Sequence, residues 1–250
     1  MSVQSGGSDA AKADELYSGN SSLIAAAHEL KAPLVVIRQL ALLLQEDTLL
    51  DVSKRQELSN QITLTSERSL RLVEALTRST RLQESEFNPE PVQITRLCED
   101  VAHELSPLCK ALQKDIQLHL PAQPVLAYAN YDLLRSITVG LCDNALSHGE
   151  AKTAVILTAT NKKSRNTLRI GVRDNGPRLP KDALKQLRQR LGKAPQPVTR
   201  RPAASGLGLY IAGQFAEAMD SKLGMIAHRH SGATFYVETP LVEQLSFLPS

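Results

Sequence analysis

The first third of the chain carries a heptad repeat of apolar residues. Spacings that alternate between four and three residues place side chains along one seam of a helix, and a sustained repeat is typical of helices that pair. The repeat predicts a first long helix, with Ser21 or Ser22 as the cap at its start. Its apolar members are Leu23, Ala27, Leu30, Leu34, Ile37, Ala41 and Leu44.

A second amphipathic helix is expected from about Lys54 to Glu84, after a turn near residues 47–53. Two long helices with a short connection form an antiparallel hairpin. One hairpin buries little apolar surface, so we expect two copies of the chain to complete a four-helix bundle. The residues of the second helix that we expect to face a core are Leu58, Ile62, Leu72 and Leu76.

The segment 87–91, Phe-Asn-Pro-Glu-Pro, interrupts the helical pattern and predicts a domain boundary. Beyond it, short apolar strands and amphipathic helices follow one another, which predicts helices layered on a sheet. The expected fold class is therefore α+β, an N-terminal helical hairpin followed by an α/β sandwich. The domains predicted are a flexible tail over 1–20, the hairpin over 21–86 and the sandwich over 87–245. We expect helices near 95–112, 131–147 and 206–218, and strands near 116–118, 125–128, 154–157, 168–172, 223–227 and 233–237.

Composition narrows the class of protein. Hydrophobic residues make up 42% of the chain and charged residues 22%, which is ordinary for a folded protein. A net charge of +3, the absence of Trp and an aromatic content of 4% argue against a nucleic-acid-binding surface. There is no apolar run of about 20 residues and no signal-peptide pattern, so we expect a cytoplasmic protein without a membrane span. The three cysteines form no CxxC pair, which predicts reduced, buried thiols.

The heptad repeat leaves one histidine outside the seam of the first helix. Ala27 and Leu30 belong to the seam, so His28 and Glu29 lie on its flank, where an imidazole is open to a phosphate donor. A carboxylate that keeps one ring nitrogen protonated leaves the lone pair of the other nitrogen free to attack. Pro33 gives no hydrogen bond to the carbonyl of Glu29 and predicts a bend just beyond the histidine. A lone exposed histidine is otherwise an ordinary surface residue.

The segment 28–34, His-Glu-Leu-Lys-Ala-Pro-Leu, resembles the H box of sensor histidine kinases. The resemblance implies that His28 is the phosphoacceptor and that Glu29 is its general base. The other sequence boxes of the family follow in the same order, so the resemblance extends over about residues 21–240.

The segment 143–148, Asp-Asn-Ala-Leu-Ser-His, resembles the N box of the same family. Asn144 lies beside the apolar stripe of its helix, and its amide oxygen is a hard ligand of the kind that Mg²⁺ prefers. The resemblance implies that Asn144 binds Mg²⁺ and ATP. It also places His148 near the phosphates.

Two glycine-containing segments resemble the G1 and G2 boxes. In the first, Asp174-Asn175-Gly176-Pro177, a carboxylate at a strand end suits the adenine amino group, and Gly176 lets the main chain approach the ring. In the second, glycines open a helix whose free N–H groups suit a phosphate. The basic stretch 178–205 between them corresponds to the lid over ATP in this family. Further ATP-binding residues implied here are Gly206, Gly208, Leu209 and, in a final glycine turn, Thr234.

Three positions depart from the family pattern. Gly140 stands where many members carry a first N-box Asn, and Arg178 replaces the second glycine of the G1 turn. Ala32 stands where phosphatase-competent members have Thr or Asn to orient a water molecule. We therefore expect little or no phosphatase activity.

The resemblance implies a two-component histidine kinase with a HisKA-type dimerisation hairpin and a GHKL-type ATP-binding domain. It implies ATP and Mg²⁺ as cofactors, a homodimer, and transfer of the phosphoryl group from His28 to an Asp of a response-regulator receiver domain. A separate sensor protein is a further candidate partner. One alternative is a phosphotransferase with a degenerate, non-catalytic nucleotide domain. A GHKL serine kinase is disfavoured by the His28 box, and a purely structural coiled-coil dimer leaves the nucleotide-like half without a role.

Overall fold

The computed structural model describes residues 6–46, 51–82, 87–150, 153–178, 180–193 and 206–242. The side chains of residues 6–23, His148 and Lys163 lie outside this description. The described chain divides into two compact units. One contains the residues up to Arg71 with Gly206 and Leu207, and the other contains residues 72–193 and those from Gly208 onwards. In the described ranges, we find no helix with an apolar stretch long enough to cross a membrane.

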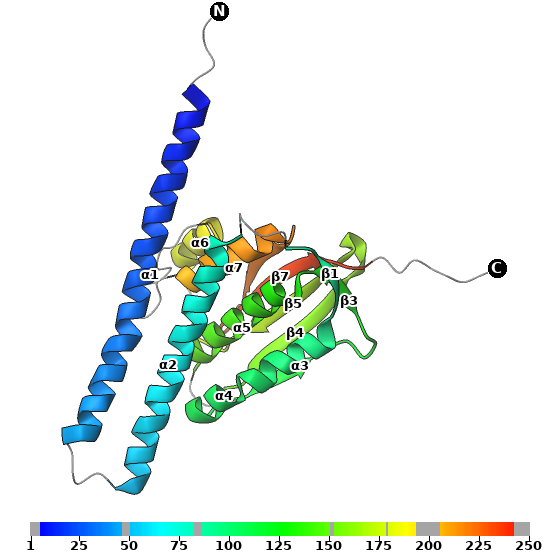
Figure 1. Ribbon diagram of the computed structural model, residues 1–250. Helices are drawn as coiled ribbons and strands as arrows, with labels where there is room; N and C mark the ends of the chain where they lie inside the picture. Colours follow the sequence, from blue (N-terminus) through cyan, green and yellow to red (C-terminus); the bar gives the residue numbers. More distant parts are fainter. Residues whose placement is uncertain are drawn as a thin grey trace, which may run out of the picture. The chain divides into compact units, whose positions relative to one another are not determined.

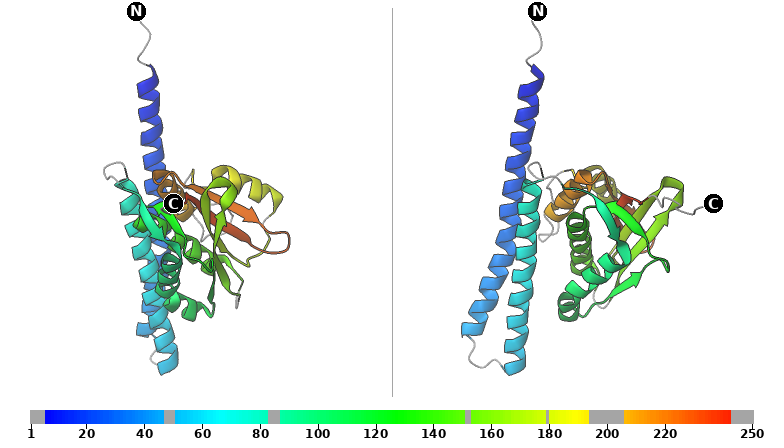
Figure 2. Two further views of the ribbon diagram at one scale, coloured as in Figure 1. Left: turned by 90° about the vertical axis from the view of Figure 1, so that its right-hand side faces the viewer. Right: turned by 45° about the vertical axis from the view of Figure 1, so that its right-hand side comes forward.

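Two long helices run side by side in opposite directions in the first unit (Figure 2). They are α1 (Gly6–Glu46) and α2 (Val52–Thr80), and α2 continues into the second unit. Asp51 caps α2, because its Oδ1 accepts a hydrogen bond from the amide of Lys54 at 2.7 Å. Residues 6–20, expected as a flexible tail, are helical instead, and their Ala, Lys and Glu residues are strong helix formers.

The buried face of the hairpin only partly follows the predicted repeat. Ala26 of α1 and Leu58 of α2 are buried, and Leu30 is half-buried. Ala27 and Leu34 are exposed, although the repeat assigns both to the seam. The apolar stripe of α1 is therefore wider than the part of it that is covered. Its exposed apolar members are Ile24, Leu34, Val35, Val36, Leu42 and Leu43.

A mixed five-stranded sheet forms the centre of the second unit, with the strand order β2-β4-β5-β7-β6. β2 and β4 are parallel, and the other neighbours are antiparallel. A second sheet pairs β1 with β3. β1 was not predicted from the sequence because it contains Pro91, a residue disfavoured within strands. The strands are β1 (Glu90–Gln93), β2 (Ile116–His119), β3 (Leu126–Ala129), β4 (Val155–Lys162), β5 (Thr167–Arg173), β6 (Lys222–Ala227) and β7 (Ala233–Pro240).

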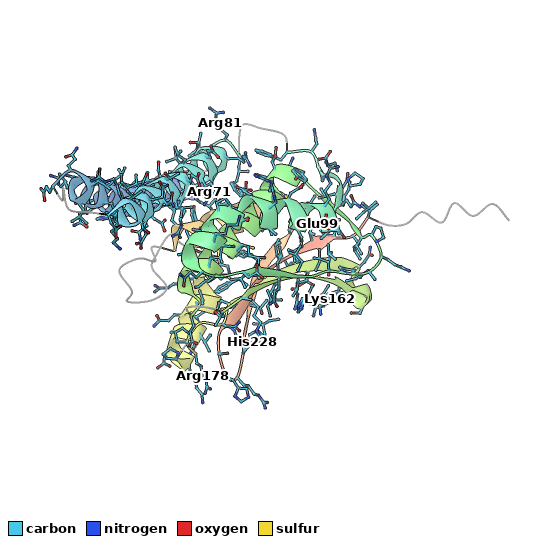
Figure 3. All side chains as sticks on the ribbon, turned by 90° about the horizontal axis from the view of Figure 1, so that it is seen from below. Arg71, Arg81, Glu99, Lys162, Arg178 and His228 are labelled. Atoms are coloured by element: carbon cyan, nitrogen blue, oxygen red, sulfur yellow. The ribbon has the colours of Figure 1, made fainter. Side chains whose placement is uncertain are left out.

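Helices α3 and α5 pack on one face of the five-stranded sheet (Figure 1). Leu157 of β4 and Ile170 of β5 are fully buried on this face. Figure 3 shows Glu99 on α3, in the helix layer, and Lys162 at the end of β4. Asn130 starts α5, because its side chain accepts a hydrogen bond from the amide of Leu133 at 3.1 Å. The helices are α3 (Ile94–Glu104), α4 (Ser106–Leu112), α5 (Tyr131–His148), α6 (Lys181–Arg190) and α7 (Leu207–Ala218). The α+β fold class predicted from the sequence is confirmed.

The three cysteines lie in the core of the second unit. Cys98, Cys109 and Cys142 come from α3, α4 and α5, and all three are free thiols and buried, as predicted. Burial, with a smaller contribution from the neighbouring Glu99 carboxylate, raises the pKa of Cys98 to about 12. Burial also raises the pKa values of Cys109 and Cys142.

A pair of glycines brings the residues after α6 against the middle of α7. Gly192 has a φ of +71°, and a Cβ added at Gly213 would lie 2.3 Å from the Cα of Gly192. Only glycine at both positions lets the two backbones approach this closely. The pair therefore fixes where the chain leaves α6.

We predict that Gly213→Ala lowers the free energy of unfolding by about 1–3 kcal/mol, because the added methyl group meets main-chain atoms. Helix propensity alone predicts the opposite sign, a gain of about 1 kcal/mol for Ala over Gly. Gly140→Ala in α5 is the matched control, because a Cβ there meets no atom within 4 Å. Urea unfolding followed by circular dichroism measures both variants. Equal stabilisation of the two would contradict the close contact.

Candidate active site

Asp174 follows β5 and is held by main-chain hydrogen bonds. Its Oδ1 accepts a hydrogen bond from the amide of Gly176 at 2.9 Å and from that of Ala233 at 3.2 Å. Its own amide donates to the Ala233 carbonyl at 3.0 Å. Gly232, with a φ of +68°, permits this approach, because a Cβ there would lie 2.0 Å from the Asp174 carbonyl oxygen. The carboxylate is therefore fixed in orientation, and Oδ2 has no hydrogen-bond partner in the described part of the chain.

The sheet topology brings other segments to the same end of β5. Because β5 is antiparallel to β4 and β4 is parallel to β2, the end of β5 lies at the edge where β4 and β2 begin. Nδ2 of Asn175 donates to the carbonyl of Ala154, just before β4, at 3.0 Å. Lys114, just before β2, donates through Nζ to the carbonyls of Leu146 and Gly149 at 2.7 and 2.8 Å. The end of α5 is thus tied to this edge of the sheet.

Asn144 lies on α5, about one turn before its end, and is half-buried. A Cβ added at Gly208 would lie 3.9 Å from Nδ2 of Asn144, so the first turn of α7 passes close to this amide. The first N–H groups of a helix have no partner within the helix and attract anions. An amide oxygen beside such a helix start suits a phosphate together with its cation.

Most of the other predicted ATP-binding residues lie just before or within the first turn of α7, in the turn after β5 and at the end of α5. Gly206 has a φ of +74° just before α7, a conformation that glycine adopts without strain. Leu209 is half-buried in the first turn of α7, and Gly176 is buried in the turn after Asp174. The side chain of His148 lies outside the described residues, so its predicted place near the phosphates stays a prediction.

The hydroxyl of Thr234 is directed to a histidine that the sequence did not single out. Oγ1 of Thr234 lies 2.8 Å from Nε2 of His228, whereas the amide and carbonyl of Ala233 contact Asp174. The glycine turn therefore reaches the Asp174 carboxylate through its main chain. Sequence reasoning had no signal for His228, because its partners come from other strands.

Two residues depart from the family pattern in this domain, Gly140 and Arg178. Gly140 borders space in which a Cβ meets no atom within 4 Å. Arg178 is exposed, and Figure 3 labels it close to α6.

His28 is exposed on α1, as the heptad repeat predicted. Glu29 is half-buried beside it in the sequence, with one carboxylate oxygen shielded from solvent. Pro33 lies within α1, one turn further on. The hairpin thus presents an accessible imidazole next to a partly desolvated carboxylate.

The described residues offer few clustered ligands for a divalent cation. The described residues contain no group of three or more His, Cys, Asp or Glu side chains that could hold a metal. Mg²⁺ at nucleotide sites is usually bound by one or two protein ligands together with phosphates and water. The Asn144 amide oxygen fits a cation of this kind when a nucleotide supplies the other ligands.

Comparison with known proteins gives concordant matches. Residues 129–243 match the family described as histidine kinase-, DNA gyrase B-, and HSP90-like ATPase. The sensor histidine kinase AruS of Pseudomonas aeruginosa is 29% identical over 86% of this chain, and the adaptive-response sensory kinase SasA of Prochlorococcus marinus is 26% identical over 91%. The chain spans only 22% and 60% of the lengths of these two relatives. The crystal structure of full-length ShkA in complex with AMPPNP has a TM-score of 0.57 at 24% identity, covering 89% of this chain and 46% of that one.

The sandwich, the aspartate fixed at a strand end and the glycines that open α7 define, with the family match, a GHKL-type ATPase domain. With the helical hairpin before this domain and two sensory kinases among its relatives, the chain is similar to sensor histidine kinases.

The environment of His228 predicts a pH-dependent stability. Burial and the neighbouring Arg173 lower the pKa of His228, and the nearby Asp174 opposes them. The unfolded chain therefore binds this proton more tightly, so stability falls as pH drops below about 6.5. His228→Gln should reduce the difference in Tm between about pH 7.5 and about pH 5.5. His230→Gln, exposed in the same turn, is the control. An unchanged difference in the His228 variant would contradict this assignment.

Proposed function

We propose that this chain is a histidine kinase that phosphorylates its own His28 with ATP. The observation that carries the proposal is the presence, in one chain, of an exposed imidazole followed by a half-buried carboxylate and of a GHKL-type domain whose Asp174 is fixed by two amides. In this proposal, residues 21–86 form the dimerisation and phosphotransfer hairpin, and residues 87–245 form the ATP-binding domain.

His28 supplies the nucleophile in the proposed reaction. The lone pair of one ring nitrogen forms a bond to the γ-phosphorus, the bond from that phosphorus to its bridging oxygen breaks, and ADP leaves with the oxygen. Glu29 accepts the proton from the other ring nitrogen. Phosphoryl transfer depends chiefly on positioning and on neutralisation of charge, so an exposed imidazole needs little further activation.

The nucleotide occupies the region around Asp174 in this proposal. Oδ2 of Asp174 accepts a hydrogen bond from the adenine amino group, since Oδ1 already accepts two main-chain bonds. Asn144 holds Mg²⁺, which neutralises phosphate charge when bound. The other proposed contacts to ATP are His148, Gly176, Gly206, Gly208, Leu209 and Thr234.

Transfer to a response regulator and dimerisation complete the proposal. A phosphorylated His28 passes its phosphoryl group to an Asp of a receiver domain, and a separate sensor protein supplies the input. The exposed apolar side of α1, with Leu34 58% exposed, supports a homodimer, because such stripes are normally covered. Two hairpins joined along this side give a four-helix bundle.

The alternative of a degenerate nucleotide domain receives less support. A degenerate site would be expected to lose its acidic anchor or to be filled by side chains. Asp174 instead keeps one carboxylate oxygen, Oδ2, that accepts no hydrogen bond from the described residues. A Cβ at Gly140 would meet no atom within 4 Å, and Arg178 is exposed. These observations favour a site that still binds ATP.

Autophosphorylation with γ-labelled ATP tests the proposal. We expect acid-labile, alkali-stable label on the wild-type chain and none on His28→Gln, because the amide of Gln is no nucleophile for phosphorus. ATP binding should persist in that variant, while Asn144→Asp should impair it. His103→Gln, exposed on α3, is the control and should be labelled like the wild type. Label that survives in His28→Gln would reject the site.

The same preparation tests the expected lack of phosphatase activity. Ala32 is exposed on α1 and carries no group that can orient a water molecule. The wild-type chain should leave the half-life of a phosphorylated receiver unchanged. Ala32→Thr should shorten it several-fold, about 1 kcal/mol of transition-state stabilisation. Rapid dephosphorylation by the wild type would show that another residue serves this role.

A further inference from the structure

The last turn of α5 ends without the usual local cap. Many helices end in a left-handed glycine that turns the chain back and satisfies their free carbonyl groups. Gly149, at this position, is extended, with φ and ψ of −63° and 157°. Its amide bonds to the carbonyl of Ala145, and the carbonyls of Leu146 and Gly149 need a donor from elsewhere.

Lys114, which lies more than 30 residues earlier in the sequence, supplies that donor. Its Nζ lies 2.7 Å from the carbonyl oxygen of Leu146 and 2.8 Å from that of Gly149. A cation at a helix C-terminus also opposes the partial negative charge of the helix dipole. Lys114 itself is held in place, because its amide donates to the carbonyl of Cys109 at the end of α4 at 2.9 Å. Figure 1 shows α4 near the end of α5.

The same ammonium group lies within electrostatic range of Asp174. The Asp174 carboxylate favours the charged form of Lys114, although burial has the larger effect and lowers the pKa of this lysine. Asn144 lies on α5 about one turn before the capped carbonyls. One side chain therefore connects the helix that carries Asn144 with the sheet edge that carries Asp174.

We propose that Lys114 is a positioning residue of the nucleotide site, which fixes the last turn of α5 and so sets Asn144 at the correct distance from Asp174. The inference rests on the proposed ATP-binding function and deepens it. Lys114 does not need to touch the nucleotide. Its effect passes through the capped turn, so it should act more on Mg²⁺-bound than on Mg²⁺-free ATP, because Asn144 is the proposed ligand of the cation.

The test compares three variants of the full chain. Lys114→Met removes the charge and the donors but keeps the length of the side chain, and Lys114→Arg keeps donors for both carbonyls. Lys110→Met, at an exposed lysine of α4, is the matched control. Two measurements are made: hydrogen exchange of the amides at the end of α5 without nucleotide, and the Kd for ATP with Mg²⁺ and with EDTA.

For Lys114→Met we expect faster exchange at the end of α5 and a Kd for Mg²⁺–ATP raised about tenfold, as for the loss of a hydrogen bond to a charged group. The Kd measured in EDTA should rise less. A general loss of stability would raise both values by the same factor. Lys114→Arg should recover most of the affinity, and Lys110→Met should match the wild type.

Three results would overturn the proposal: wild-type affinity in Lys114→Met, equal weakening of ATP binding with and without Mg²⁺, or no recovery of affinity in Lys114→Arg. If Lys114→Met does not fold, Lys114→Gln replaces it with the same criteria. A wild-type chain that binds no ATP would refute the proposed function instead. The exchange measurement would still decide whether Lys114 caps α5.

Discussion

The proposed nucleotide site depends on the contact between Asp174, which follows β5, and Ala233 at the start of β7. Two amides hold one oxygen of the Asp174 carboxylate, and the missing side chain of Gly232 makes that approach possible. A carboxylate held by main-chain amides loses little conformational entropy when a ligand binds. It is therefore already oriented toward a hydrogen-bond donor of the ligand before binding. Any residue other than glycine at 232 would push the two strands apart at the point where they position this group.

The proposed phosphoacceptor, His28, and the proposed nucleotide site around Asp174 are positioned in different ways. A long helix displays His28 in solvent, where an imidazole is free to meet several partners. The sheet edge instead brings together loop residues that are distant in the sequence and holds them with hydrogen bonds to main-chain groups. The proposed nucleotide site is thus the more rigidly held of the two, while His28 remains accessible. An accessible imidazole suits its proposed role, in which it receives a phosphoryl group and then gives it away.

Local patterns gave most of the secondary structure. The alternation through β5 and the apolar stripe of α5 were visible in the sequence, and the segments around His28, Asn144 and Asp174 resembled the boxes of sensor histidine kinases. Prolines were harder to interpret: Pro107 divides the single helix expected over 95–112 into two. Long-range contacts gave no signal at all. The Gly192–Gly213 approach and the two bonds of Lys114 follow from how helices pack, and no periodicity encodes them.

The reactivity of the buried cysteines reports how often the core of this domain opens. A thiol whose pKa is raised to about 12, as for Cys98, is almost entirely protonated near neutral pH and is also shielded from reagents. Alkylation of Cys98 and Cys142, which are fully buried on α3 and α5, therefore requires this part of the core to open. The rate of alkylation would measure this opening, and a nucleotide that stabilises the closed domain would lower the rate.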